Sequence, residues 1–310
     1  MNDTQTTFRC YLCDATEFDS VMPYRANFSD AIFQNSNIIK CKNCGLLQIN
    51  KKFTPETIED YYKYTYDREK MYNFHLDQFP YDNKWSVSRG RALAKLLKQQ
   101  NLDKKQDSVV MDLGCGYGHL LYGFKNYFQN QYRVIGVDYD EKVKPISDKN
   151  NWKFIPGGID DVYKDYAGKI DILITSHVFE HVINPPDFLN KCSLLLVQDG
   201  ILLWEMPNLN AYNLECEPRH SPHICLWDIH SINEILLRND FEIVFLETAG
   251  KKYKWLDRKK PLPLFLNKVY NKLTRNEETF ELNDRNSIGF ELDKYGVNRR
   301  NIRLIARKKH

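Results

Sequence analysis

The stretch MDLGCGYGH, from Met111 to His119, carries the strongest indication of the fold. It overlaps the apolar run Val109 to Leu113, which is typical of a buried parallel strand, and the apolar residues after it have helical spacing. Glycine recurs at every second position, at Gly114, Gly116 and Gly118. Glycine permits sharp turns and lets a ligand approach the backbone closely. A glycine loop between a strand and a helix predicts the nucleotide-binding edge of an open α/β sheet.

A second segment, VIGVDYD from Val134 to Asp140, predicts the neighbouring strand. It ends at Asp138, where a carboxylate can accept hydrogen bonds from both hydroxyls of a ribose. The glycine spacing differs from the G-x-G-x-x-G of a dinucleotide site. Asp112, which precedes the glycines, favours a cationic ligand over a phosphate. A tight strand-to-helix turn that binds no ligand is the alternative interpretation.

These segments resemble motif I and the following strand of the class I S-adenosylmethionine-dependent methyltransferases. The resemblance implies that the loop wraps the amino-acid part of S-adenosyl-L-methionine and that Asp138 holds its ribose. It also implies that Ile159 and Asp160, in PGGIDDV, face the adenine, and that His177 contacts the cofactor through its backbone. The residues expected to bind the cofactor are Asp112, Gly114, Cys115, Gly116, Gly118, Asp138, Tyr139, Ile159, Asp160, Ser176 and His177.

The remaining chain continues the alternation of strands and helices that predicts a doubly wound, parallel sheet. The stretch SHVFEHVINPP, from Ser176 to Pro186, closely resembles the EHV-x-x-P segment of ubiquinone-type and polysaccharide-cluster methyltransferases. We therefore expect an α/β, Rossmann-like, seven-stranded sheet. Its strands are predicted near residues 109–113, 134–138, 152–154, 170–175, 199–208, 241–246 and 302–306, with helices near 91–100 and 231–237.

Two CxxC pairs near the start of the chain predict a small zinc ribbon. Four thiolates with this spacing are typical of a structural, tetrahedral zinc site, formed here by Cys10, Cys13, Cys41 and Cys44. Disulfides and a redox-active CxxC are the alternatives; the first is disfavoured because no secretory signal pattern is seen. The pattern also resembles the N-terminal zinc ribbon of bacterial methyltransferases that modify sugars.

We expect three regions: a zinc ribbon at 1–52, a helical linker or lid at 53–104, and a methyltransferase domain at 105–310. The second region is rich in tyrosine, which either folds over the cofactor or packs as part of a linker. The third contains an insertion at 250–300. Residues 251–273 of it combine a basic run with an apolar stripe, which could contact an anionic membrane surface, hold phosphates of a nucleotide- or lipid-linked acceptor, or form a solvated face.

Composition narrows the class of protein. The net charge of +3 argues against a dedicated nucleic-acid binder. No 18-residue apolar run predicts a transmembrane helix, and the first residues lack a signal pattern, so we expect a cytoplasmic protein. The segment Thr175 to Val178 replaces the Asn/Asp-Pro-Pro-Tyr box that, in this family, marks methylation of nucleic-acid bases.

Methyl transfer to a hydroxyl requires a base that removes its proton. Candidates beyond the fourth and fifth strands are His181, His223 and His220, with Glu180 and Glu205 as partners that could orient them. The resemblance favours O-methylation of a sugar, nucleotide-sugar or lipid-linked glycan in surface polysaccharide or secondary-metabolite synthesis. A zinc-ribbon rRNA methyltransferase and a non-catalytic cofactor-binding scaffold are the alternatives.

Overall fold

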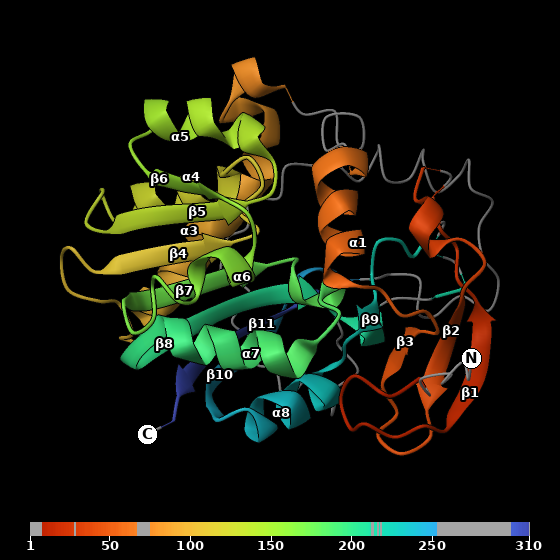
Figure 1. Cartoon of the computed structure of the whole chain (residues 1–310). Helices are drawn as coiled ribbons and strands as arrows, with labels where there is room; N and C mark the ends of the chain where they lie inside the picture. Colours follow the sequence, from red (N-terminus) through yellow and green to blue (C-terminus); the bar gives the residue numbers. More distant parts are fainter. Residues whose placement is uncertain are drawn as a thin grey trace.

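A computed structural model describes residues 8–27, 29–66, 75–211, 214–215, 217, 219–252 and 299–309. Within these residues a seven-stranded sheet and a four-stranded sheet lie side by side, with helix α1 (Pro55–Asp60) between them (Figure 1). The large sheet has the strand order β10-β11-β8-β7-β4-β5-β6. Its strands are β4 (Val109–Leu113), β5 (Arg133–Asp138), β6 (Lys153–Pro156), β7 (Ile170–Ser176), β8 (Leu196–Pro207), β10 (Phe241–Lys252) and β11 (Arg299–Lys308).

The predicted Rossmann-like, seven-stranded fold is confirmed, with one correction to the expectation of a parallel sheet. Strands β6, β5, β4, β7 and β8 are parallel, whereas β11 runs antiparallel to both β8 and β10. Antiparallel neighbours need no crossover helix, so β11 can follow β10 directly in the sheet. Strands β10 and β11 are also longer than predicted. Most of the predicted insertion at 250–300, with all but the first two residues of its basic run, falls at residues 253–298, which lie outside the described part of the chain.

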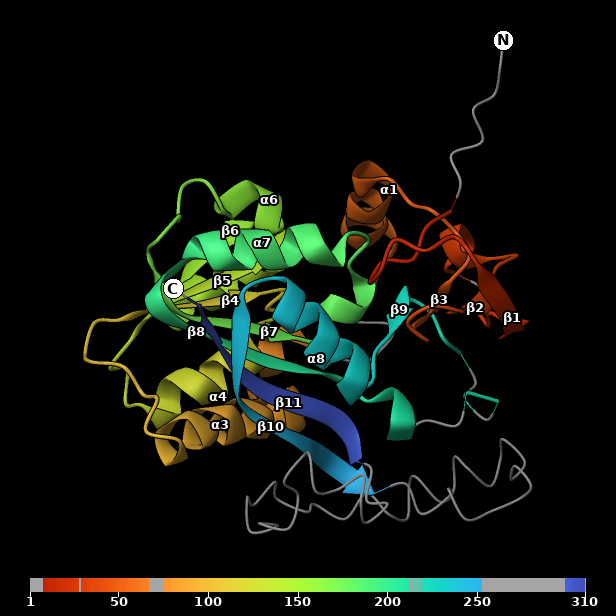
Figure 2. The same ribbon diagram turned by 90° about the horizontal axis from the view of Figure 1, so that it is seen from below.

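Helices cover both faces of the large sheet (Figure 2). One face carries α3 (Lys84–Gln99), α4 (His119–Tyr127) and α5 (Lys144–Lys149); the other carries α6 (Ile159–Val162), α7 (Pro185–Leu195) and α8 (Ile229–Arg238). Helix α3 begins seven residues before the predicted start. The Asn83 side chain caps it by accepting a hydrogen bond from the Ser86 amide at 3.1 Å, a favourable N-terminus that apolar spacing alone does not reveal.

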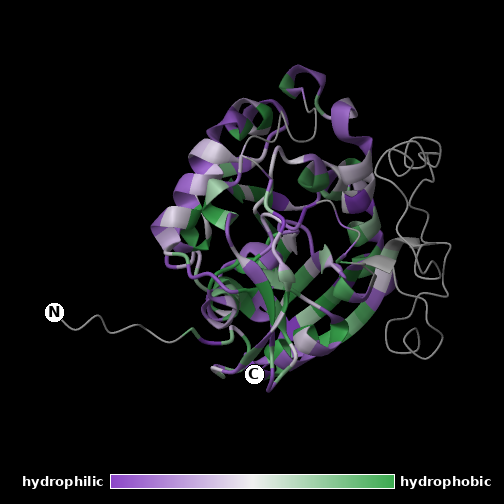
Figure 3. Cartoon of the chain, turned by 90° about the vertical axis from the view of Figure 1, so that its right-hand side faces the viewer, coloured by the Kyte–Doolittle hydropathy of each residue, from purple (hydrophilic) through white to green (hydrophobic). Residues whose placement is uncertain are grey.

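The alternation of strand residues divides the core into two layers. Val110 faces the α3–α5 layer, whereas its neighbour Met111 faces the α6–α8 layer. Hydrophobic residues therefore follow the central strands, and the outward surfaces of the helices are hydrophilic (Figure 3). Helices α3 and α4 pack so closely that a Cβ on Gly90 would lie 1.9 Å from the carbonyl oxygen of Leu120. This close packing fixes the position of α3 relative to the cofactor loop.

The four-stranded sheet combines three strands from the N-terminal region with one strand from the second half of the chain. Strands β1 (Phe18–Pro23), β2 (Asn37–Cys41) and β3 (Leu47–Ile49) are followed in the sheet by β9 (Cys225–Leu226). Buried residues of this sheet belong to the same hydrophobic cluster as the α6–α8 layer. We call the described residues of the region 1–52, with β1 to β3, the ribbon. Its core is continuous with that of the large sheet.

The predicted lid region begins with α1 and the π-helical turn η2 (Tyr61–Thr65). Short 3-10 turns, η3 (Leu76–Gln78) and η4 (Tyr81–Asn83), precede α3, and residues 67–74 of this tyrosine-rich region lie outside the described part. Within the part of the chain that the structure describes, no helix has the length and apolar character needed to cross a membrane.

Candidate cofactor and acceptor site

The glycine loop after β4 packs against the segment that follows β7. Gly114 adopts φ +69°, a left-handed conformation that glycine adopts without steric cost. A Cβ at this position would lie 2.5 Å from Cγ2 of Val178, so the loop could not keep this path with a larger residue. The predicted loop residues thus form one compact edge at the carboxyl ends of the parallel strands, where open α/β sheets bind their ligands.

Asp138 fastens the glycine loop to the end of β5. Its carboxylate, almost fully buried, accepts hydrogen bonds from the amides of Gly116 at 2.8 Å and Asp140 at 3.1 Å. A carboxylate oxygen has two lone pairs, so one that accepts an amide hydrogen bond can also accept from a ligand hydroxyl. The geometry is compatible with the predicted ribose contact and adds a second role in holding the loop.

Asp112 lies buried beneath the same loop. Burial, and then the nearby Asp138 carboxylate, raise the pKa of Asp112 well above its ordinary value, although Arg89 opposes this shift. A buried carboxyl of this kind favours a neutral form unless a positive charge arrives. A cationic ligand in the loop would therefore favour the ionised form of Asp112, and it would bind that form more tightly than the neutral one.

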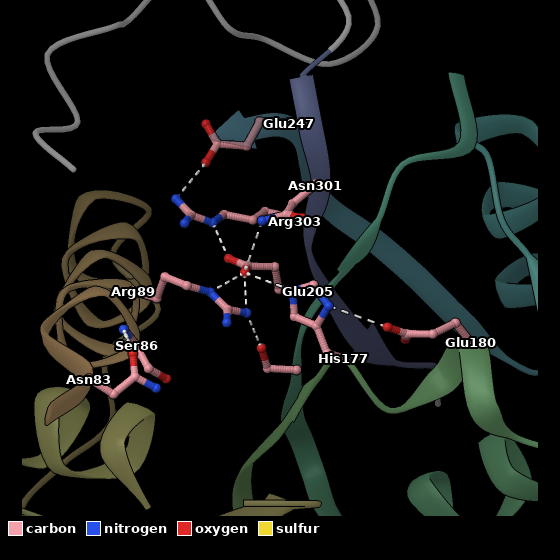
Figure 4. Close-up of polar contacts among 10 residues, drawn as sticks. Asn83, Ser86, Arg89, His177, Glu180, Glu205, Glu247, Asn301 and Arg303 are labelled. Carbon is pink, nitrogen blue, oxygen red and sulfur yellow. Dashed lines mark hydrogen bonds and ion pairs between the residues drawn. The ribbon is translucent and has the colours of Figure 1, made fainter. Parts of the chain in front are cut away.

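Glu205 at the end of β8 is the centre of a buried network that sequence reasoning did not identify as such (Figure 4). Its carboxylate accepts hydrogen bonds from Nε of Arg89 at 2.6 Å and Nε of Arg303 at 2.5 Å. Asn301 donates to it at 3.4 Å, and Arg303 also lies 3.7 Å from Glu247. Burial would raise the pKa of Glu205, but the two guanidinium groups hold it well below its usual range.

Arg89 also connects this network to the predicted cofactor residues. Its Nη2 donates to the hydroxyl of Ser176, at the end of β7. The sequence pattern could have identified Arg89, because it shares one face of α3 with the buried residues Leu93 and Leu96. A charged residue on the apolar face of a helix is unusual and needs a buried partner.

Three histidines surround the buried carboxylate of Glu180. The distances to Oε1 are 3.3 Å from Nδ1 of His177, 3.7 Å from Nε2 of His181 and 4.0 Å from Nε2 of His223. The structure thus brings together two of the three predicted bases around one carboxylate. Within the described residues, neither oxygen of Glu180 accepts a hydrogen bond, so its contacts with the histidines are electrostatic.

The charges in this cluster differ between its members. Burial alone would raise the pKa of Glu180, but the imidazoles of His181, His177 and His223 lower it to about 2. Burial and the neighbouring His181 lower the pKa of His223 to about 3. Burial and Arg89 oppose protonation of His177, yet its contacts with Glu180 and Glu205 raise its pKa. Glu180 is therefore ionised and His223 neutral near pH 7.

Hydrogen bonds distinguish the roles open to the other predicted bases. Nδ1 of His181 donates to the Pro222 carbonyl at 3.1 Å, which leaves Nε2 directed toward Glu180. Both ring nitrogens of His220 are engaged: Nδ1 accepts from the Arg25 amide at 3.0 Å and Nε2 donates to the Leu214 carbonyl at 3.1 Å. His220 therefore lacks a ring nitrogen for proton transfer in this arrangement, and its geometry favours a positioning role.

A small pocket of about 70 Å³ opens beside this cluster. Glu180 and His223 belong to its lining, and the other lining residues are mostly apolar. The lining residues are Glu180, Pro207, Leu209, Leu214, Glu217, Arg219, His220, His223, Cys225, Leu226 and Trp227. The mixture of apolar side chains with a few polar groups is like the lining of small-molecule sites, although the volume is below the roughly 300–1,000 Å³ usual for them.

Tyrosines of η2 lie between the predicted adenine side and the histidine cluster. The ring of Tyr62 is stacked with that of Tyr139, with centroids 6.4 Å apart, and meets His181 edge-on at 6.1 Å. This arrangement is compatible with the predicted lid. Ile159 opens α6, while Asp160 next to it is exposed and forms an ion pair with Lys191 at 2.5 Å, so adenine would compete with that lysine for its carboxylate.

The four predicted zinc ligands converge. The sulfur atoms of Cys10 and Cys44, and those of Cys13 and Cys41, are 3.5 Å apart, and all four lie within 4.8 Å of one another. A tetrahedral zinc with bonds of about 2.3 Å separates its sulfurs by roughly 3.8 Å, so the thiols fit this metal. Asp14 adopts the same left-handed conformation as Gly45, each one residue after a CxxC pair, so both turns have the same form.

Comparison with known proteins agrees with this fold. A family model described as a methyltransferase domain matches residues 84–246, more than half of the chain. The chain therefore belongs to the methyltransferase-domain family. A ubiquinone biosynthesis O-methyltransferase of Caulobacter sp. is 27% identical over 125 residues, which are 38% of this chain and 48% of that protein. The chain thus spans about half the length of the curated relative that it matches.

Two solved structures have the fold of this chain at low sequence identity. One is the 1,6-didemethyltoxoflavin-N1-methyltransferase of Burkholderia thailandensis, bound to its substrate and S-adenosylhomocysteine, with a TM-score of 0.51, 11% identity, and coverage of 94% of this chain and 100% of that one. The other is a methyltransferase complexed with the Trm112 activator of Haloferax volcanii, with a TM-score of 0.51, 14% identity, and coverage of 74% and 92%. The shared fold is that of S-adenosylmethionine-dependent methyltransferases.

Proposed function

We propose that this protein transfers the methyl group of S-adenosyl-L-methionine to a small-molecule acceptor. The observation that carries the proposal is the glycine loop at the carboxyl edge of the sheet, with Asp138 fastening it and Asp112 buried beneath it. Family membership supports the same cofactor. Calorimetry with S-adenosylhomocysteine tests it: we expect saturable binding, and a complete absence of heat at millimolar ligand would refute the assignment.

We propose a hydroxyl as the methyl acceptor, most specifically that of a sugar, nucleotide-sugar or lipid-linked glycan. The pocket beside His223 is small and partly polar, and the matched relative from Caulobacter is an O-methyltransferase. The likeness of the ribbon to those of sugar methyltransferases favours a glycan. A screen of nucleotide sugars with methyl-labelled cofactor tests the class, and incorporation into total RNA instead would support the rRNA alternative.

We propose His223 as the base. It lines the pocket, and its imidazole is neutral near pH 7, which is the form that a general base requires. In the reaction, His223 takes the hydroxyl proton while the oxygen attacks the methyl carbon and the carbon–sulfur bond breaks. The neutral thioether leaves with that electron pair. Glu180, 4.0 Å from Nε2 of His223, would stabilise the imidazolium that forms.

A divalent cation is the second candidate role for the same cluster. Ligand atoms of Glu180, His181 and His223 all lie within 4.8 Å of one another, a spacing that a metal can bridge. Metal analysis separates the two roles. One zinc per chain matches the cysteine site alone, whereas a second equivalent that is lost in Glu180→Gln would favour the cation.

The sulfur geometry supports a structural zinc bound by Cys10, Cys13, Cys41 and Cys44. Four thiolates leave no open coordination position, so the metal would stabilise the ribbon and take no part in methyl transfer. We keep the domain bounds of 1–52, 53–104 and 105–310, and a cytoplasmic location, as parts of this proposal. A scaffold without catalysis would bind the cofactor yet show no transfer to any acceptor in the screen.

A further inference from the structure

The loop that carries His220 and His223 is held by the ribbon through an arginine. We call residues 219–226, together with Leu214, Glu215 and Glu217, the acceptor loop. Nη1 of Arg25 donates to three carbonyl oxygens of this loop, at 3.4, 2.9 and 2.6 Å in the order Leu214, Glu215 and Glu217. The Arg25 amide donates to Nδ1 of His220 at 3.0 Å, and its carbonyl accepts from the His220 amide at 2.7 Å.

Further bonds attach the same ribbon segment to the loop. The hydroxyl of Tyr24 donates to the His223 carbonyl at 2.8 Å. The Ser221 hydroxyl donates to Asp30 at 2.5 Å and accepts from the Asn27 amide at 2.9 Å. Asp30 is buried and also accepts from Tyr61 of η2 at 3.0 Å. Because most of these groups are buried, losing one partner leaves the other unsatisfied at substantial cost.

The cysteine turns are connected to this loop through β3 and β9. The fully buried side chain of Gln48 accepts from the amide of Tyr11, between Cys10 and Cys13, while its backbone pairs with Cys225. Ile224 completes the connection. Its carbonyl accepts from the Ile49 amide at 3.0 Å, and its own amide donates to the Glu180 carbonyl at 2.7 Å.

We propose that Arg25 is a positioning residue of the acceptor site, and that metal binding by the four cysteines orders the acceptor loop that presents His223 to Glu180. That this loop serves an acceptor rests on the proposed function; the physical coupling does not. Loss of Arg25 or of the metal should therefore disorder the acceptor loop, which carries His223. The glycine loop should keep its affinity for S-adenosylhomocysteine, the product formed from the cofactor.

The first test compares Arg25→Ala with Lys51→Ala in the full chain. Lys51 is a matched control because its ammonium donates to a carbonyl of the ribbon itself, Gln34, at 3.4 Å. We expect amide hydrogen exchange in peptides covering 219–226 to accelerate about tenfold or more in Arg25→Ala and not in Lys51→Ala. Nitrogen chemical shifts of His220 should show loss of its fixed tautomer, a change that a general loss of stability would not produce selectively.

S-adenosylhomocysteine affinity is measured on the same samples. A dissociation constant within about twofold of the wild type is expected for Arg25→Ala, since the hydrogen bonds described for Arg25 go to the acceptor loop and not to the glycine loop. Unchanged exchange at 219–226 would overturn the proposal. If Arg25→Ala does not fold, Ser221→Ala and Arg25→Lys replace it: faster exchange in Ser221→Ala with partial protection in Arg25→Lys supports the proposal, and wild-type exchange in both overturns it.

The second test removes the metal. Zinc-loaded and chelator-treated full chains are compared by the same exchange experiment. We expect peptides at 38–49 and 219–226 to lose protection together, while those at 111–119 stay protected. Loss confined to 38–49 would overturn the coupling. Failure of the proposed function has a different signature, because the wild-type chain would then bind no S-adenosylhomocysteine at all.

Discussion

Replacing Glu205 by glutamine should destabilise the whole fold more than its single charge suggests. The carboxylate is fully buried and accepts from Arg89, Arg303 and Asn301. The neutral amide of Glu205→Gln would leave two buried guanidinium groups without their shared anion. Breaking a buried pair in this way typically costs about 3–5 kcal/mol. With an unfolding entropy of about 0.65 kcal/mol per kelvin for 310 residues, the midpoint should fall by roughly 5–8 °C.

The measurement is thermal and urea unfolding at pH 7, with Glu234→Gln as the control. Glu234 pairs with Arg238 on the surface of α8, where such a pair contributes less than about 1 kcal/mol. The pKa of Glu205 is held low in the folded protein, so its contribution is present above the unfolded carboxyl pKa, near 4.3, and is lost as the pH falls. Equal destabilisation by the two variants at pH 7 would refute the reasoning.

Four further outcomes are expected. Asp138→Asn should weaken S-adenosylhomocysteine binding by about tenfold or more, because a charged acceptor becomes an amide; calorimetry that shows unchanged affinity would contradict the ribose role. Once an acceptor is found, His223→Gln should lower kcat by about 10²–10⁴-fold with product affinity retained, and near-wild-type turnover would remove His223 as the base. The pKa values of His119, His220 and His223 are lowered, so each binds a proton more readily when unfolded. Their contribution to the free energy of unfolding is present above about pH 6.5 and is lost as the pH falls. Between pH 7 and 5, the free energy of unfolding should therefore decline less steeply in His223→Gln than in the wild type. Equal slopes in the two proteins would argue against a lowered pKa of His223. Finally, protein prepared without chelators should contain zinc that Cys13→Ser releases, and metal-free wild-type protein would exclude the cysteine site.

The sequence predicts the central strands of the large sheet well because they are nearly continuous apolar runs; β4 is followed by Gly114, and β5 ends at Asp138. Strand β4 matches its predicted bounds, and the register of β4 with β5 brings Asp112 opposite Gly136. The ends of β10 and β11 were less predictable. Their outer parts carry charged residues such as Lys252 and Arg299, and pairing between strands rather than hydrophobicity extends them.

The site shows a similar division. The CxxC spacing was enough to predict that the four cysteines form one site, since each CxxC turn is a local structure. Arg89 and Arg303 could not be assigned in this way, because they are 214 residues apart in sequence and meet only through Glu205. The distinction between His220 and His223 likewise depends on hydrogen bonds from Arg25, which no local pattern encodes. Local chemistry is readable from sequence, whereas pairing across the fold requires the structure.

Strand β9 has a consequence for the order in which the chain acquires its structure during synthesis. The ribbon sheet is completed only when Ile224 accepts a hydrogen bond from Ile49, 175 residues earlier in the sequence. At about 5–20 residues per second, the ribosome needs roughly 9–35 s to supply that partner. Throughout this interval β3 is an open edge on the nascent chain, and unpaired strand edges are sites of association between chains. A metal captured early by the four cysteines would limit that exposure by holding the two turns together before the rest of the fold exists.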